Sequence, residues 1–217
     1  MAGISLAVSF NKEQEMLINE VMSDPLFKHS DWNKEELKKE LQELRSYIRE
    51  HYKKEQKEKC AYCQNDLSTV SALNCHVEHI VPKSRYDSFM FEPKNLCVAC
   101  ADCNQIKNEQ DTLTPLSSGK ARKQYPRSSS GFHIIHPHFD DYEKHLEIYH
   151  GKWYIDLTPK GHFTIGACKL NQRSGRYGIE EPDEMIQLAI ELQEAKQAKK
   201  HVLVGLIKKR IRELCDE

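Results

Sequence analysis

Apolar residues recur at helical spacing near both ends of the chain, with polar residues between them. In the N-terminal part this pattern predicts helices over residues 11–22 and 33–58, the second capped near Ser30 or Asp31. The apolar stripe of the second helix consists of Leu37, Leu41, Leu44 and Ile48. Residues 182–215 predict one or two further helices. Stripes of this kind usually pack into a core, and a partner-binding face is the alternative.

The middle of the chain alternates apolar and polar residues, which is typical of short strands. Residues 74–81 predict a strand that Pro82 ends. Further strands are expected at 132–136, 146–150, 153–157 and 162–167, with turns at 151–152 and 159–161. Residues 115–131 are rich in Pro, Ser, Gly and basic residues, and they predict a loop. Together the two patterns predict a mixed α+β fold.

Composition narrows the class of protein. The chain has 217 residues, of which 39% are hydrophobic, so it is one ordinary globular domain or a small core with appendages. No apolar run approaches the length needed to cross a membrane. The first residues lack the basic segment of a signal peptide, so we expect a cytoplasmic protein. The formal net charge of −1 argues against a chain that binds nucleic acid through a strongly basic surface of its own.

Two Cys-x-x-Cys pairs, Cys60 with Cys63 and Cys100 with Cys103, predict a structural zinc site. Four thiolates satisfy tetrahedral zinc, and this spacing lets both sulfurs of one turn reach the same ion. Eight cysteines would also allow disulfides, but in a reducing compartment such pairs are more often metal ligands. Cys97 lies three residues before Cys100, so a pair that includes Cys97 stays open. We favour Cys100 and Cys103.

The segment between the cysteine pairs places a carboxylate beside a histidine, Glu78-His79. Neutral imidazole can accept a proton from water near neutral pH. Neighbouring residues of a regular strand point to opposite faces, so both can serve one site only where the strand bends or ends. A helix is expected to begin near Asn104, which places Asn104 and Lys107 on one face. Lys107 is more simply explained as a lysine on the surface of that helix.

One run of residues resembles an HNH endonuclease of the ββα-metal type. The run is Cys60-x2-Cys63, Glu78-His79-Ile80-x-Pro82-x-Ser84, Asn95-Leu96 and Cys100-x2-Cys103-Asn104-x2-Lys107, over about residues 58–110. The resemblance implies that His79 is the general base and that Asn95 anchors the loop that fixes it. It also implies that Glu78 and Asn104 hold one magnesium or manganese ion. The chain departs from the commonest family pattern by having Glu rather than Asp before the base, and Asn rather than His at the third motif position.

Basic residues near this run are candidates for substrate contacts. Lys83, Arg85 and Lys107 are candidate phosphate-binding residues. Residues 120–123, with Arg127 beyond them, form a second basic strip, for which a solvated loop is an equally consistent interpretation. The substrate implied by the family is DNA, with products that carry a 5′-phosphate and a 3′-hydroxyl. An RNA substrate, including tRNA, stays open, as does a non-catalytic zinc module that docks nucleic acid or protein.

A wider and less specific similarity suggests a partner. The order of the HNH-like run, then His136-Pro137-x-x-Asp140-Asp141, is similar to the PtuB-type nucleases of Septu and retron anti-phage systems. That similarity implies an ABC/SMC-type ATPase partner, which would supply DNA binding that the chain's neutral charge does not; an oligomer stays open. The expected organisation is a helical extension over 1–58, a zinc-stapled HNH core over 59–112, a basic loop over 113–131, and an α/β then helical region over 132–217.

Overall fold

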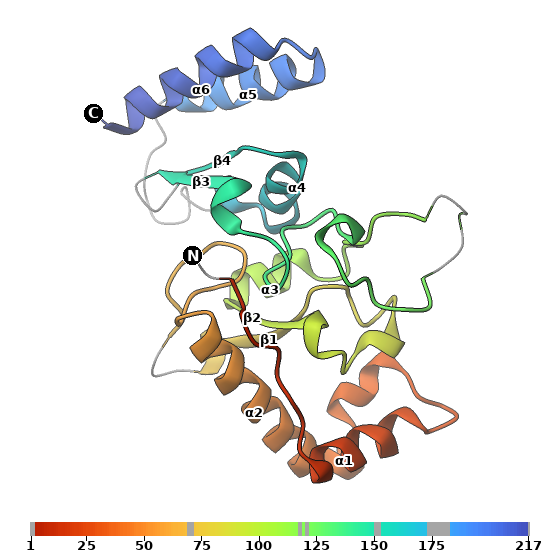
Figure 1. Ribbon diagram of the computed structural model, residues 1–217. Coiled ribbons are helices and arrows are strands. Elements are labelled where there is room, and N and C mark those ends of the chain that lie inside the picture. The colour runs from red at the N-terminus through yellow and green to blue at the C-terminus, as the bar shows by residue number, and fades with distance from the viewer. Residues whose placement is uncertain are drawn as a thin grey trace.

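The computed structural model describes residues 3–68, 72–116, 119, 122–149, 153–172 and 183–216 (Figure 1). Its α-helices are α1 (Lys12–Met22), α2 (Lys38–Glu55), α3 (Ala101–Lys107), α4 (Pro159–Cys168), α5 (Asp183–Gln197) and α6 (His201–Asp216). Its strands are β1 (His76–His79), β2 (Leu96–Ala99), β3 (Leu146–Tyr149) and β4 (Trp153–Asp156). The short 3₁₀ helices that bear on the site are η1 (His29–Asn33), η2 (Glu35–Leu37) and η5 (Pro93–Asn95).

Helix α1 agrees with the predicted helix over 11–22. It begins with a capping box, in which the Asn11 side chain accepts from the Gln14 N–H at 2.9 Å and Gln14 accepts from the Asn11 N–H at 3.0 Å. These two bonds satisfy N–H groups that the first helical turn leaves without partners. The buried residues Ile18 and Val21 then face the rest of the molecule.

Helix α2 is shorter than the predicted helix over 33–58, and the predicted cap is wrong. The carboxylate of Asp31 accepts from the Lys28 N–H at 2.9 Å, so it closes η1 rather than α2. Lys34 then leaves the helical region of the backbone, with φ −55° and ψ 123°. At the other end, Lys57 and Glu58 have φ of 52° and 60°, a left-handed conformation that an α-helix cannot contain.

The apolar stripe of α2 is confirmed over most of its length, since Leu41, Leu44 and Ile48 are buried. Strands β1 and β2 pair antiparallel, with Glu78 opposite Cys97, and α2 packs against both. Figure 1 shows this helix running along one side of the small sheet. The N-terminal extension is therefore built into the same core as the strands.

Helix α3 follows β2 directly and begins at Ala101, three residues before the predicted start near Asn104. Its N-cap is Cys100, whose sulfur accepts from the Cys103 N–H at 3.5 Å. The same turn that brings two cysteines together thus also starts the helix. Asn104 and Lys107 both lie within α3, one turn apart.

The region after residue 131 departs from the predicted pattern in two places. Strands β3 and β4 lie where strands were expected at 146–150 and 153–157, and they pair antiparallel. The turn expected at 151–152 lies outside the described residues. Residues 132–136 form no strand, because only Phe132 makes a bridge, to Leu113.

The strand predicted at 162–167 and the turn at 159–161 are both wrong, because these residues form α4. Thr158 caps the helix by accepting from the Gly161 N–H, and Pro159 takes the first helical position, which needs no N–H donor. A side chain at position 161 could not fit, since a Cβ there would lie 2.0 Å from the carbonyl oxygen of His145. Gly161 therefore allows α4 to approach the segment before β3 closely.

Buried apolar residues form two clusters. The larger one is continuous from Ile4 to Leu170, so it crosses the predicted limits at residues 58 and 131. The smaller one joins β4 to the C-terminal helices through Ile155, Leu188, Ala195, Ile207 and Ile211. Figure 1 shows α5 and α6 side by side at one end of the molecule, beyond β3 and β4. Within the described ranges, no helix has both the length and the apolar character of a bilayer span.

Candidate functional site

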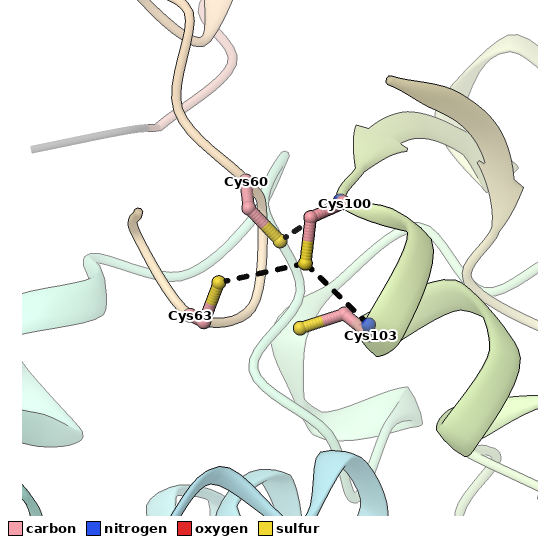
Figure 2. A group of neighbouring side chains, drawn as sticks. All are labelled: Cys60, Cys63, Cys100 and Cys103. Atoms are coloured by element: carbon pink, nitrogen blue, oxygen red, sulfur yellow. Dashed lines mark hydrogen bonds between the residues drawn. The ribbon is translucent and has the colours of Figure 1, made fainter. Parts of the chain in front are cut away.

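Four buried cysteines form a cluster that could hold zinc (Figure 2). The sulfurs of Cys60, Cys63, Cys100 and Cys103 all lie within 4.8 Å of one another. The Sγ atoms of Cys63 and Cys100 are 3.8 Å apart. Zinc–sulfur bonds of about 2.3 Å in a tetrahedron place neighbouring sulfurs about 3.8 Å apart, so this donor set fits zinc in both chemistry and spacing.

Local backbone bonds build the first half of this cluster. The Cys60 N–H donates to the Asn65 carbonyl at 2.9 Å, and the Gln64 N–H donates to the Cys60 carbonyl at 3.0 Å. Gln64 has φ of 58°, which turns the chain back after Cys63. The result is a tight turn in which the sulfurs of Cys60 and Cys63 face the start of α3 (Figure 2).

Two tyrosines from the C-terminal half hold the same turn from outside. Tyr142 Oη donates to the carbonyl of Tyr62 at 2.7 Å, and Tyr154 Oη donates to the carbonyl of Cys63 at 2.6 Å. Both hydroxyls come from residues about 80 to 90 positions later in the chain. The cluster is therefore supported by parts of the chain that its sequence motif does not include.

Cys97 does not join the cluster. It lies in β2 opposite Glu78 and is fully buried, and burial raises the pKa of its thiol well above its ordinary value. A buried neutral thiol packs as a small apolar side chain. The described structure thus groups Cys100 with Cys103 and leaves Cys97 in the sheet, which is the arrangement favoured from the sequence.

A pocket of about 690 Å³ lies beside the end of β1. Glu78 and His79 both line it, although they are consecutive. Strand β1 ends at His79, which agrees with the expectation that both side chains can serve one site only at a strand end. Asn104 of α3 and Lys83 also line this pocket, so four of the residues singled out in the sequence converge there.

The ring of His79 is fixed on two sides. Its Nε2 lies 3.0 Å from the carbonyl oxygen of Met90, and its ring meets Trp32 edge to face with centroids 4.6 Å apart. A carbonyl only accepts, so Nε2 carries the hydrogen and Nδ1 keeps a free lone pair. Burial, together with the nearby charge of Lys83, lowers the pKa of His79 to about 3, so the ring is neutral at neutral pH.

Asn95 ties together the two segments that position this ring. Its Oδ1 accepts from the Val81 N–H at 2.7 Å, and its Nδ2 donates to the carbonyls of Val81 at 3.1 Å and Phe89 at 2.9 Å. Val81 follows the end of β1, and Phe89 precedes the residue whose carbonyl holds His79. The fully buried Asn95 side chain is thus bonded on both sides of the catalytic candidate.

Glu78 forms a buried ion pair with Lys107. The Nζ of Lys107 lies 2.7 Å from Oε1 of Glu78 and donates to the carbonyl of His79 at 3.0 Å. Tyr62 Oη also approaches Glu78 Oε1, at 3.4 Å. Burial raises the pKa of the Glu78 carboxyl, and the ammonium of Lys107 opposes that shift. The expected surface position of Lys107 is wrong, since the side chain is 0% exposed.

Comparison with known protein families bears on this arrangement. Residues 60–110 match the family model of HNH endonucleases. The matched residues contain the cysteine cluster, the Glu78-His79 pair and all of α3, and the match supports a metal-dependent nuclease. Comparisons with curated proteins and with solved structures gave no match.

Outside the HNH segment, by which we mean residues 60–110, the structure adds pocket residues that the sequence analysis did not single out. The pocket is also lined by residues of η1 and α2, namely His29, Trp32, Asn33, Arg45 and Arg49. The spacing Arg45-x3-Arg49 beside the apolar stripe was the available signal. It was not informative without the fold, because α2 precedes the HNH segment and nothing local indicates which face it presents.

The remaining basic candidates lie elsewhere. Arg85 is exposed and does not line the pocket of the HNH segment. In the basic strip, Arg122 donates to the carbonyl of Thr114, and Arg127 pairs with Glu92 at 3.1 Å. Lys120 lies outside the described residues. Two arginines of this strip therefore already have partners within the protein.

The Lys107–Glu78 pair of the HNH segment leads to a stability prediction. Replacing Lys107 by Met should lower the free energy of unfolding by about 3–5 kcal/mol, because the Glu78 carboxylate is left without its buried counter-charge. Urea denaturation would measure the change. Lys38→Met is the control, since its ion pair with Glu35 is largely exposed, with side chains 63% and 77% accessible, and should matter little.

The double variant Lys107→Met/Glu78→Gln removes both charges and should recover a large part of the loss. If Lys107→Met lowered the free energy of unfolding no more than Lys38→Met does, the buried ion pair would stabilise the protein no more than the exposed one, and the prediction would be wrong.

Proposed function

We propose that this protein is an HNH endonuclease that hydrolyses DNA phosphodiester bonds, with His79 as the general base. The observation that carries the proposal is the convergence of His79, Glu78 and Asn104 on one pocket next to a four-cysteine cluster. None of these side chains would be informative alone. Together they supply a proton acceptor and oxygen donors in a single concave site, as hydrolysis of a phosphodiester requires.

His79 would take the proton from the attacking water at Nδ1. The hydrogen bond from Nε2 to Met90 sets the tautomer, and contact with Trp32 limits rotation of the ring. Asn95 would act as a positioning residue, because its hydrogen bonds hold the segments on either side of the ring. Such pre-organisation means that little reordering is needed when substrate arrives.

Glu78 and Asn104 would hold one magnesium or manganese ion through a carboxylate and an amide oxygen, the ligand types that hard cations prefer. Lys107 and Tyr62 both contact Oε1 of Glu78, so we assign Oε2 to the cation. When bound, the ion would neutralise charge on the phosphate and on the leaving oxygen. Lys83 lines the same pocket and would contact a substrate phosphate.

We further propose that the nuclease works in the cytoplasm with an ABC/SMC-type ATPase, as part of an anti-phage defence complex. The support is the similarity of the order of motifs to PtuB-type nucleases. The net charge of −1 agrees with a chain whose affinity for DNA is increased by a partner.

The proposal predicts that the purified protein cuts plasmid DNA only when magnesium or manganese is added. The assay should be run with the protein alone and with any ATPase encoded beside it, and products resolved on an agarose gel. Dependence of cutting on the ATPase would support the defence complex. Cutting at the same rate without it would contradict a required partner and leave the nuclease proposal intact.

Absence of DNA cutting by a folded, zinc-loaded protein under both conditions would contradict the DNA endonuclease. Cutting of RNA in the same assay would then identify the alternative substrate. Binding of nucleic acid without cutting of either would identify a non-catalytic zinc module. In that last case the His79→Ala, Glu78→Gln and Asn104→Ala variants should bind as the wild type does.

A further inference from the structure

The pocket has a second wall that belongs to the N-terminal extension rather than to the HNH segment. Arg45 and Arg49 of α2 line it together with Trp32 of η1. The two arginines are four residues apart, so they lie on the same face of the helix, one turn from each other. Trp32 touches the ring of His79, which places this wall directly beside the candidate base.

The guanidinium groups of these arginines are poorly satisfied within the protein. Arg45 donates one hydrogen bond, to the carbonyl of Trp32, and no carboxylate among the described residues pairs with it. Arg49 donates to Ser46 Oγ at 3.2 Å and only reaches Glu50 at 4.0 Å. Each guanidinium offers five N–H donors, so most of them remain available to a ligand.

This arrangement is unfavourable for the isolated protein. Like charges four residues apart on a helix repel each other, and both side chains are half-buried. Burial lowers the pKa of Arg45, and the charge of Arg49 lowers it further. An anion bound between the two groups would relieve both effects.

The rest of the pocket fits an anionic ligand too. Lys83 adds a third cationic group. Two carboxylates also line the pocket: Glu78, whose charge is balanced by Lys107, and Glu109, so cationic groups remain in excess. Ser84 lines the pocket, and its Oγ is buried with no hydrogen-bond partner in the part of the chain that the structure describes. After rotation about χ1 this hydroxyl would donate to a phosphate oxygen. Locally the pocket is cationic, although the whole chain carries a net charge of −1.

We propose that Arg45 and Arg49 bind the phosphodiester backbone of the DNA next to the bond that is cut. The inference rests on the proposed function and deepens it, because it gives the N-terminal extension a share in substrate binding. The planar, forked guanidinium matches the phosphate oxygens and can form two parallel hydrogen bonds with them. The substrate would thus contact α2 as well as the HNH residues.

The test measures binding separately from cutting. The full-length His79→Ala protein, without added divalent cation, is titrated with a fluorescein-labelled DNA duplex, and anisotropy is followed at several salt concentrations. Arg45→Gln and Arg49→Gln should each weaken binding about tenfold. The slope of log K against log salt should become about 0.9 less steep for each phosphate that is no longer neutralised. With the base intact, the double variant should also cut plasmid at least tenfold more slowly.

Lys54→Gln is the matched control. It removes the same charge from the same helix, and Lys54 lies two and a half turns from Arg45, on the opposite side. This variant should bind and cut like its parent. Thermal melting of all variants confirms that the fold is retained.

The outcomes separate the inference from the function. If the wild type cuts DNA and the double arginine variant cuts and binds equally well, the inference is wrong and the nuclease proposal stands. If the wild type cuts nothing, the nuclease proposal fails, and the anisotropy titration still decides whether the arginines bind DNA. If the arginine variants bound an RNA oligonucleotide more weakly than their parent but bound the DNA duplex equally well, DNA would not be the ligand of these arginines.

Discussion

His79→Ala is expected to reduce metal-dependent DNA cutting by about 10²–10⁴-fold, the usual contribution of a general base. The ring is the only part of the side chain that can take a proton, and its Nε2 is already bonded to the carbonyl of Met90. Initial rates of plasmid cutting, wild type against variant at the same zinc content, measure the effect. His29 and His76 also line the pocket, but among the described residues only His79 is bonded to Met90 and packed on Trp32, so neither takes the position of the lost ring.

The control is His133→Ala, which removes an exposed histidine outside the pocket and should leave the rate unchanged. Added imidazole offers a second readout. Removing the ring leaves a space beside Trp32, and free imidazole that enters it should restore part of the rate. Full activity of His79→Ala would remove this residue from the mechanism, and equal losses in both variants would indicate a general effect of losing a histidine.

The second large effect concerns the cysteine cluster. Cys103→Ser should abolish zinc binding and leave the protein unfolded or aggregated, because a structural zinc site contributes on the order of 10 kcal/mol. That exceeds or equals the whole stability of many domains, about 5–15 kcal/mol. Cys103 is fully buried in the first turn of α3, where its sulfur lies within 4.8 Å of the sulfurs of Cys60 and Cys63. Zinc per chain by elemental analysis and thermal melting are the measurements.

Cys97→Ser is the matched control, since Cys97 is equally buried and lies in the adjoining strand, but outside the cluster. It should keep one zinc per chain, even if the buried hydroxyl lowers the melting temperature. If Cys97→Ser lost zinc and Cys103→Ser kept it, Cys97 rather than Cys103 would be the zinc ligand. A folded, zinc-free Cys103→Ser protein would contradict the structural role of the metal.

Features that depend on neighbouring residues were predictable from the sequence. Helix α1 and the two Cys-x-x-Cys turns rest on contacts a few residues apart, and the strand predicted over 74–81 is found in the shorter form of β1, His76–His79. Predictions over the C-terminal half were less accurate because the structure there also depends on contacts between distant segments. The stretch that forms α4 also alternates, and a strand was expected there. The local start signals, Thr158 as N-cap and Pro159 at the first helical position, were present but were interpreted as a turn. The close approach of Gly161 to His145 is a tertiary contact that no local pattern records.

The sequence alone therefore established a zinc-type cysteine frame around a histidine and a carboxylate, because both follow from residue type and short spacing. It did not establish the burial of Lys107, its pairing with Glu78, or the presence of Arg45 and Arg49 in the same pocket as the HNH residues. Those contacts join residues that lie tens of positions apart. They depend on how α2 and α3 pack against β1 and β2, and helix packing is decided by the whole buried surface rather than by any one segment.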